Sequence, residues 1–505
     1  MATVTLSATP SLYSPVSAPI WFRFNSSSSN VTDFKYLFNI FKNDELTGAT
    51  TSLGQYKVPP RPSVGDGIFD VHRILQSQVS YDINHTISTS TVAPNSITKY
   101  GLSYGFEYNP GVDFVRTFSS TYSTLGLSFS VAHPFQVGDL LLINKDDKTT
   151  NPQYDGTASI IGLIGTSSIV TDNPFLTIVT NETGSIDSYQ RVTGTTSGYF
   201  AFNGTRQYAQ QGFDFGSTYL VTCTGSNIGA TYALTNYAFD TLPPGSFYDE
   251  SAKVVELNDY ETLSYLVDNS KSSINFIQYM FYTDNSGSPA LNTTQYVTYS
   301  VNSNYHRVDV PAGPLNINNM PGFDQSIWDQ VQYYTVSVNG TWDVPGRPTN
   351  NGRYSGLKKF KVKDNDPFAN CSSKYPKIRL CWLNRLGGID YFSFNFKSKN
   401  AIATEKVIFK RNLDWNYTVG QREDTVLTQT AMEIWNISSD FISQNESNWL
   451  KELFTSPEVY YLSGTTKIPI IIGDSSYEVK TSVNDHLIAV TLTYRMASNV
   501  NLQSS

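Results

Sequence analysis

Hydrophobic residues along this chain recur mainly at every second position, in short runs separated by residues that favour turns. The clearest segments are Asp33–Phe41 and Tyr100–Tyr108. Their alternating apolar positions are Phe34, Tyr36, Phe38 and Ile40 in the first, and Tyr100, Leu102, Tyr104, Phe106 and Tyr108 in the second. Because successive side chains of a strand point to opposite faces, each segment is predicted to be a half-buried strand with one aromatic face.

Helical spacing of apolar residues occurs in two places. In Gly67–Gln76 the apolar positions fit one or two turns of helix, and they are Ile68, Val71, Ile74 and Leu75. Ser443-Gln-Asn-Glu446 fits a capping box, in which a hydroxyl and a carboxylate three residues apart bind free backbone N–H groups. The apolar stripe behind this box consists of Trp449, Leu450, Leu453 and Phe454, so we predict a helix there.

These patterns predict an all-β protein with several β-sandwich or small-barrel domains and one short C-terminal helix. A chain of 505 residues corresponds to about three or four folded units. The block 119–185 has its own short strands, with Asp-Gly and Asn-Pro turns, and is predicted to be an inserted unit. The predicted division is an N-terminal β-sandwich over 1–118, a small inserted β domain over 119–185, a continuation of the first domain over 186–250, a second β-sandwich over 251–368, and a C-terminal β domain over 369–505 with its helix near 446–454.

The composition narrows the class of protein further. Aromatic residues make up 14% of the chain and charged residues only 15%, which excludes intrinsic disorder and a coiled coil. The formal net charge of −8 argues against general nucleic-acid binding, which needs basic surfaces. No apolar run approaches the roughly 20 residues of a membrane-spanning helix, and the segment Met1–Leu6 lacks the features of a secretory signal. We therefore expect synthesis in a reducing cytosol, where Cys223, Cys371 and Cys381 stay as buried thiols.

Patterns associated with catalysis are weak. Gly101-Leu-Ser103-Tyr-Gly105 matches the GxSxG motif, but that motif needs a strand-to-helix turn, and Ser103 lies inside a predicted strand. The five histidines show no metal-binding spacing, and we expect His133 and His306 to be polar surface residues; the others are His72, His85 and His486. Paired carboxylates for glycoside cleavage stay open, since distant strands can bring them together.

Two charged segments are candidates for ion-binding sites. Asp364-Asn-Asp366 lacks the glycine and the closing glutamate of a calcium loop. The lysines of Lys358–Lys363 are expected on a solvated or edge-protecting strand face, with contact to an anion as the second interpretation. We therefore predict no catalytic residues, no cofactor and no metal ligands, and the pattern singles out no interface residues.

Several segments resemble virion proteins of tailed phages, in a loosely defined group from phages of Bacteroidota and some marine hosts. They cover about a third of the chain and carry strand and turn preferences without a catalytic signature. In the N-terminal part they are Phe34–Phe41, Lys57–Pro62, Gly67–Asp70 and Val79–Asp82, and in the C-terminal part Leu380–Phe394, Trp449–Tyr460, Ile470–Lys480 and Asn484–Tyr494. The block 119–185 lies outside the resemblance.

The resemblance implies a non-enzymatic structural subunit of a tail, baseplate or neck ring. Such a subunit would bind copies of itself and other tail or neck proteins, and would reside in the virion tail after assembly in the host cytoplasm. A receptor- or glycan-binding fibre or spike is a second interpretation, for which the stacking candidates are Trp21, Trp328, Trp342 and Trp415; the absence of an internal repeat argues against a fibre. A capsid decoration protein and a polysaccharide depolymerase are further hypotheses that the sequence leaves open.

Overall fold

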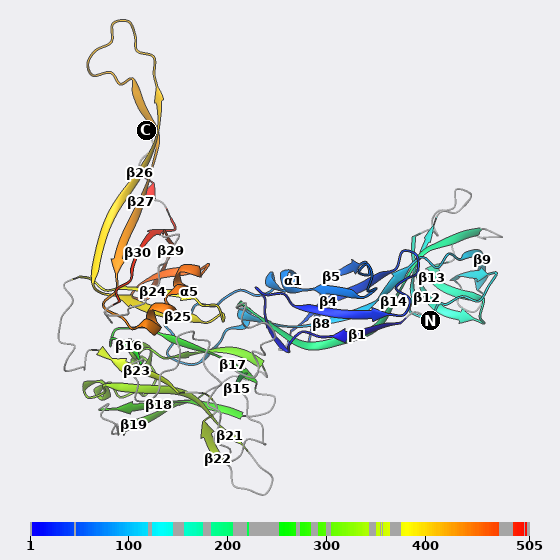
Figure 1. Ribbon diagram of the computed structural model, residues 1–505, viewed down its shortest axis with the longest axis horizontal. Helices are drawn as coiled ribbons and strands as arrows, with labels where there is room; N and C mark the ends of the chain where they lie inside the picture. The colour runs from blue at the N-terminus through cyan, green and yellow to red at the C-terminus, as the bar shows by residue number, and fades with distance from the viewer. Residues whose placement is uncertain are drawn as a thin grey trace. The chain divides into compact units, whose positions relative to one another are not determined.

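The computed structural model describes residues 3–44, 47–119, 124–144, 156–174, 183–205, 220–221, 252–268, 273–283, 291–298, 305–342, 350–353, 355, 357–363, 375–473, 488–498 and 500–501. These residues form sheets of three, ten, four, six and eight strands, joined by loops and a few short helices. The prediction of an all-β protein is confirmed (Figure 1). The chain divides into two compact units, Met1–Ser80 with Ile97–Phe202, and Tyr81–Ser96 with Asn203–Ser505.

The first unit contains a three-stranded sheet and a ten-stranded sheet. The smaller sheet has the order β1 (Val4–Ala8), β3 (Trp21–Ser26) and β6 (Gly67–Asp70), and α1 (His72–Gln76) follows it. The strands of the larger sheet are β2 (Tyr13–Pro15), β4 (Lys35–Asn43), β5 (Thr50–Val58), β8 (Ile97–Tyr108), β9 (Asp113–Ser119), β10 (Thr124–Phe129), β11 (Leu140–Asn144), β12 (Gly156–Ile164), β13 (Ser168–Pro174) and β14 (Thr183–Phe202).

Six strands at one end of the larger sheet close into a ring. The order β11-β12-β13-β10-β9-β14 returns to its start because β11 also pairs with β14. The short strands expected within 119–185 therefore form a small barrel together with β9 and β14. The five-segment domain division stays a prediction.

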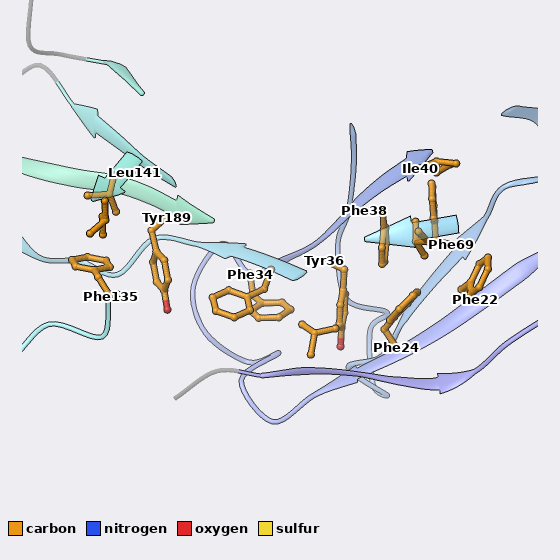
Figure 2. Close-up of a cluster of buried hydrophobic side chains, with 14 of the residues drawn as sticks. Phe22, Phe24, Phe34, Tyr36, Phe38, Ile40, Phe69, Phe135, Leu141 and Tyr189 are labelled. Atoms are coloured by element: carbon orange, nitrogen blue, oxygen red, sulfur yellow. The ribbon is translucent and has the colours of Figure 1, made fainter. Parts of the chain in front are cut away.

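Aromatic side chains fill much of the core of the first unit (Figure 2). The alternating face of β4 is buried as predicted, since Tyr36, Phe38 and Ile40 are fully inaccessible to solvent. Phe38 stacks on Phe69 of β6 at 4.6 Å and lies 4.7 Å from Phe24 of β3, measured between ring centroids. These contacts join the two sheets into a sandwich.

The second unit begins with two sheets that share one core. The four-stranded sheet has the order β15 (Leu220–Val221), β17 (Thr262–Asp268), β20 (Tyr305–Pro311) and β7 (Thr91–Val92). The six-stranded sheet contains β16 (Lys253–Val255), β23 (Lys358–Val362), β21 (Tyr333–Trp342), β18 (Ser273–Tyr282) and β19 (Leu291–Thr298), and β22 (Asn350–Arg353) pairs with β21. Tyr279 and Tyr334 are fully buried between the sheets and donate hydrogen bonds of 2.7 Å to the carbonyls of Pro311 and Ala312.

The C-terminal part of the second unit is an eight-stranded sheet. Its main order is β25 (Ile389–Phe394), β24 (Ile378–Leu383), β28 (Val459–Ser463), β29 (Thr466–Ile472), β30 (Thr491–Met496), β27 (Asp424–Ser438) and β26 (Lys397–Lys410), and β31 (Val500–Asn501) pairs with β27. The helices α4 (Gln444–Trp449) and α5 (Lys451–Thr455) confirm the predicted C-terminal helix. Its capping box is formed, since Glu446 N–H donates to Ser443 Oγ at 3.2 Å and Ser443 N–H to Glu446 Oε2 at 2.9 Å.

Two local expectations were incomplete. The helix expected within Gly67–Gln76 covers only its second half as α1, because Gly67–Asp70 pairs with β3 as strand β6. A helix that the pattern did not predict, α3 (Pro314–Asn318), begins at a proline. Proline fits the first helical position, where its missing N–H would have no helical partner.

The expectation of a solvated or edge face for the lysines of Lys358–Lys363 is wrong for the first two. Lys358 and Lys359 are each 8% exposed, because β23 lies inside the sheet, between β16 and β21. The Lys359 ammonium lies 4.4 Å from the centroid of the Tyr333 ring. A cation–π contact of this kind stabilises a lysine whose aliphatic stem is buried.

Candidate subunit interface

Ser103, the serine of the GxSxG motif, lies in the middle of β8, as predicted. Its hydroxyl is 3.1 Å from the hydroxyl of Thr195 on the adjacent strand β14. The two glycines of the motif have a packing reason. A Cβ on Gly101 would lie 2.5 Å from the Phe41 ring, and a Cβ on Gly105 would lie 1.8 Å from the Arg191 carbonyl oxygen.

The histidines and cysteines are dispersed. Burial lowers the pKa of His85, and also that of His133. The ring of His133 stands 5.4 Å from both Phe129 and Phe135, so this residue, expected at the surface, is half-buried. Cys381 is buried, as expected. Within the described ranges, no three side chains of the metal-ligating types gather in one place. The residues Cys223, Cys371, Asp364, Asp366 and His486 and the side chain of His306 lie outside those ranges.

The tryptophans considered for sugar stacking differ in how much of the side chain is exposed to solvent. Trp328 is buried, and its ring packs against Phe281 at 5.5 Å between centroids. Trp21 is 52% exposed and Trp415 is 95% exposed. The side chain of Trp342 lies outside the described part of the chain.

Trp415 belongs to the feature that sets this sheet apart, a long hairpin of β26 and β27. The two strands are 14 and 15 residues long and pair from Lys397↔Ser438 to Lys410↔Asp424. Only the base is held by other strands, since β30 pairs with Ile434–Ser438 and β31 with Thr430 and Ala431. Beyond this base the strands pair, among the described strands, only with each other (Figure 1). We call the segment Glu405–Gln429 the arm.

Apolar side chains lie exposed along the arm and at its base. Strand alternation puts Val407 and Phe409 on one face, and Ile402 and Ile408 on the other. Together with Leu427 these residues are between 41% and 66% exposed. Both faces therefore present apolar surface to water, whereas β4 buries its apolar face in a core.

The tip of the arm is ordered by backbone turns. Arg411 N–H donates to the Glu423 carbonyl at 2.7 Å, and Tyr417 N–H donates to the Asp414 carbonyl at 3.0 Å. These turns present Trp415, Tyr417 and Val419, and Val419 is fully exposed. A rigid aromatic side chain held in this way loses little entropy when a partner covers it.

The second unit also contains a cavity of about 220 Å³. Its lining includes three aromatic residues, Tyr391, Phe392 and Trp449, together with residues of β16. At its rim Val254 is 47% exposed and Phe441 is 57% exposed. The cavity is therefore open to solvent and bordered by apolar side chains.

The charged groups around this cavity are engaged with one another. Arg379 donates to Asp259 Oδ2 at 3.1 Å and to Glu261 Oε2 at 2.9 Å, and Lys253 pairs with the other oxygen of Glu261. Burial alone would raise the pKa of Asp259, but the charges of Arg379 and Lys377 outweigh it and hold this pKa below its ordinary value. Among the aromatic residues of the lining, Tyr391 and Trp449 are buried and Phe392 is half-buried, so Phe392 is the ring most open to an occupant.

No protein-family model matches this chain, and no curated protein matches it. Of the helices that the structure describes, none is long and apolar enough to cross a membrane.

The arm was not predicted from the sequence, although one signal was available. The segments on either side of 411–423 contain β-branched and other apolar residues that favour strands, such as Val407, Ile408 and Val426, and the segment between them is rich in Asn, Asp and Gly. Two strand-forming runs around a turn-rich segment are typical of a hairpin. The pattern does not say whether the apolar side chains are covered, so it could not reveal an exposed arm.

Proposed function

We propose that this protein is a non-enzymatic structural subunit of a phage tail apparatus, such as a ring, baseplate or adaptor component. It works by contacting copies of itself and neighbouring tail or neck proteins in a symmetric assembly. On this proposal the mature protein resides in the virion tail after assembly in the host cytoplasm. The observation that carries the proposal is the arm, with apolar side chains on both faces.

The argument from the arm is energetic. A two-stranded hairpin without further strands or a packed face is at best marginally stable in water. Burying apolar area contributes about 25 cal/mol per Å², so five half-exposed aliphatic and aromatic side chains favour association strongly. A partner along the whole arm accounts for Ile402 and Val407 as well as Trp415, whereas a small ligand at the tip would leave the strands uncovered.

The charge of the arm supports a protein partner over a charged ligand. Between Glu405 and Asp424 four basic residues are matched by four acidic residues. Lys410 Nζ lies 3.6 Å from Glu423 Oε1. A surface of this kind has little net attraction for an anionic polymer or membrane.

The test uses the intact chain and a variant in which Glu405–Gln429 is replaced by Asn-Gly. Because no other described strand pairs with this segment, the variant should keep the parent's circular dichroism and melting temperature. Sedimentation analysis should show oligomers of the parent chain and monomers of the variant. A monomeric parent at all concentrations, or a variant that assembles as the parent does, contradicts the role of the arm.

The assignment to the tail has a separate test. Peptide mass mapping of purified particles of the encoding phage should find this chain, and a gold-labelled antibody should bind at the tail. Particles without the chain, or label confined to the head, contradict the assignment.

A glycan-binding fibre or spike is the second candidate, because Trp415 and Trp21 are exposed enough to stack on a sugar ring. A glycan array read with the parent and with Trp415→Ala separates the candidates. Retention that is lost in the variant favours glycan binding, and the absence of any retained glycan removes this candidate.

A further inference from the structure

The arm and the aromatic cavity are different surfaces of the same chain. The arm presents exposed apolar side chains, and the cavity has a partly aromatic lining. We propose that Trp415 at the tip of one copy's arm inserts into the cavity of a neighbouring copy, against Trp449, Tyr391 and Phe392. This inference rests on the proposed assembly and names the surface that receives the arm.

The cavity has the size and the chemistry for this occupant. A volume of about 220 Å³ corresponds to roughly seven waters at about 30 Å³ each, which is room for a large aromatic side chain. The ring centroid of Trp449 is 6.0 Å from that of the half-buried Phe392, so an indole that packs on Phe392 also lies close to Trp449. Aromatic pairs add to the energy of area burial when their rings meet edge to face or offset.

The interior charges favour an apolar occupant. Lys253 Nζ lies 5.3 Å from the Trp449 ring centroid and is paired with Glu261. Glu256 accepts a hydrogen bond of 2.6 Å from Lys377. Since these groups already have partners of opposite charge, a charged ligand would gain little by entering.

The outer charges favour the tip of the arm. The lining contains four carboxylates against two lysines, with Asp440 and Glu446 towards α4. The tip from Arg411 to Arg422 carries these two arginines and one acidic residue, Asp414. The complementary signs steer the tip towards the cavity and fix its orientation.

A second copy has to supply the tryptophan. Asn395 lines the cavity and lies just before β26, which runs for 13 residue steps from Lys397 to Lys410. At about 3.3 Å per step, the end of the strand is about 40 Å from its start. Trp415 therefore cannot turn back into the cavity of its own chain.

The contact is heterologous, because the donor surface and the acceptor surface differ. Every copy then has one arm as a donor and one cavity as an acceptor. Repetition of such a contact produces a closed ring when the rotation closes, or a filament when it does not. An isologous arm-to-arm contact would instead stop at a dimer.

Two variants separate donor from acceptor. Trp415→Ala removes the tip residue and keeps the cavity, and Phe441→Asp places a charge at the cavity rim and keeps the arm. Each should weaken self-association at least about 30-fold, as loss of an interface hot spot does. Ile471→Asp, at a 43% exposed residue of β29 outside the tip and the cavity lining, is the matched control and should assemble as the parent does.

Mixing the two variants gives the decisive measurement. The intact arm of Phe441→Asp can enter the intact cavity of Trp415→Ala, so the 1:1 mixture should form heterodimers and nothing larger. A mixture that stays monomeric, with both variants folded by circular dichroism, overturns the inference. Full assembly of Phe441→Asp alone also overturns it while leaving the proposed function standing, whereas a monomeric parent chain contradicts the proposed function itself.

Discussion

Arg379 is the centre of the buried charge network, and its replacement by methionine tests how the network holds the C-terminal sheet. The side chain is 6% exposed and donates to Asp259 and Glu261. It also donates to the Tyr260 carbonyl at 3.1 and 3.2 Å and to Ser393 Oγ at 2.8 Å. Methionine keeps much of the volume and removes every one of these bonds.

The expected loss of stability depends on the two carboxylates that stay buried when Arg379 is replaced. Removing one partner of a buried ion pair costs about 3–5 kcal/mol, because the other charge stays buried without compensation. Here Asp259 keeps Lys377 at 2.8 Å, and Glu261 keeps Lys253. The destabilisation should therefore fall at the lower end of that range, about 3 kcal/mol.

The assay is urea unfolding followed by tryptophan fluorescence. Trp382 and Trp449 report on this sheet, since both are buried and their ring centroids are 5.1 Å apart. Lys377→Met is the control, because the Lys377 side chain is 25% exposed; its loss should cost about 1 kcal/mol. Equal effects of the two substitutions, or a loss below about 1 kcal/mol for Arg379→Met, would refute the reasoning.

A pH series distinguishes lost charge from lost packing. In the parent, the lowered pKa of Asp259 contributes stability above about pH 4 that is lost as the pH falls. Without Arg379, one of the two cations that lower the pKa of Asp259 is lost, so this pKa rises towards the value that burial favours, and protonation then relieves the buried charge. The stability gap between parent and variant should narrow from about pH 7 to about pH 4, and a constant gap would assign the effect to packing.

Three further predictions concern single groups. Gly105→Ala should destabilise the first unit by about 1–3 kcal/mol in thermal unfolding, because the new Cβ would meet the Arg191 carbonyl; an unchanged melting temperature contradicts this contact. Hydrogen bonding to Arg61 lowers the pKa of Asp66 to about 2, so the stability that it contributes should disappear as the pH falls from about 4 to about 2, and Asp66→Asn should flatten that dependence. Burial raises the pKa of Cys381 to about 12, so a thiol reagent should label it only on unfolding, in a chain whose other cysteines are replaced by serine; rapid labelling of the native chain would show an accessible thiol.

The secondary structure was most predictable where local chemistry decides it. The alternation of Phe34–Ile40 predicts a strand with one buried face wherever a core lies against that face. The capping box at Ser443 could be predicted from the four residues that form it. Lys359 could not be placed from its neighbours, because the ring that its ammonium contacts belongs to Tyr333 on β21, a strand that lies earlier in the chain. The cavity could not be predicted from the sequence either, because its lining comes from segments as far apart as Lys253 and Trp449.

Strands β4 and β26 both carry apolar side chains, but those of β4 are buried and those of β26 are exposed, and this difference is the basis on which we propose the arm as an interaction surface. In β4, the sheet containing β3 and β6 covers the apolar face, so Phe38 is fully buried. In β26, strand pairing is complete along the hairpin, yet Ile402 and Val407 remain more than half exposed. Local folding is therefore finished in the arm while its apolar surface is still uncovered. In the assembly that we propose, another molecule covers this hairpin, and the balance of its charges fits a protein surface better than a charged polymer.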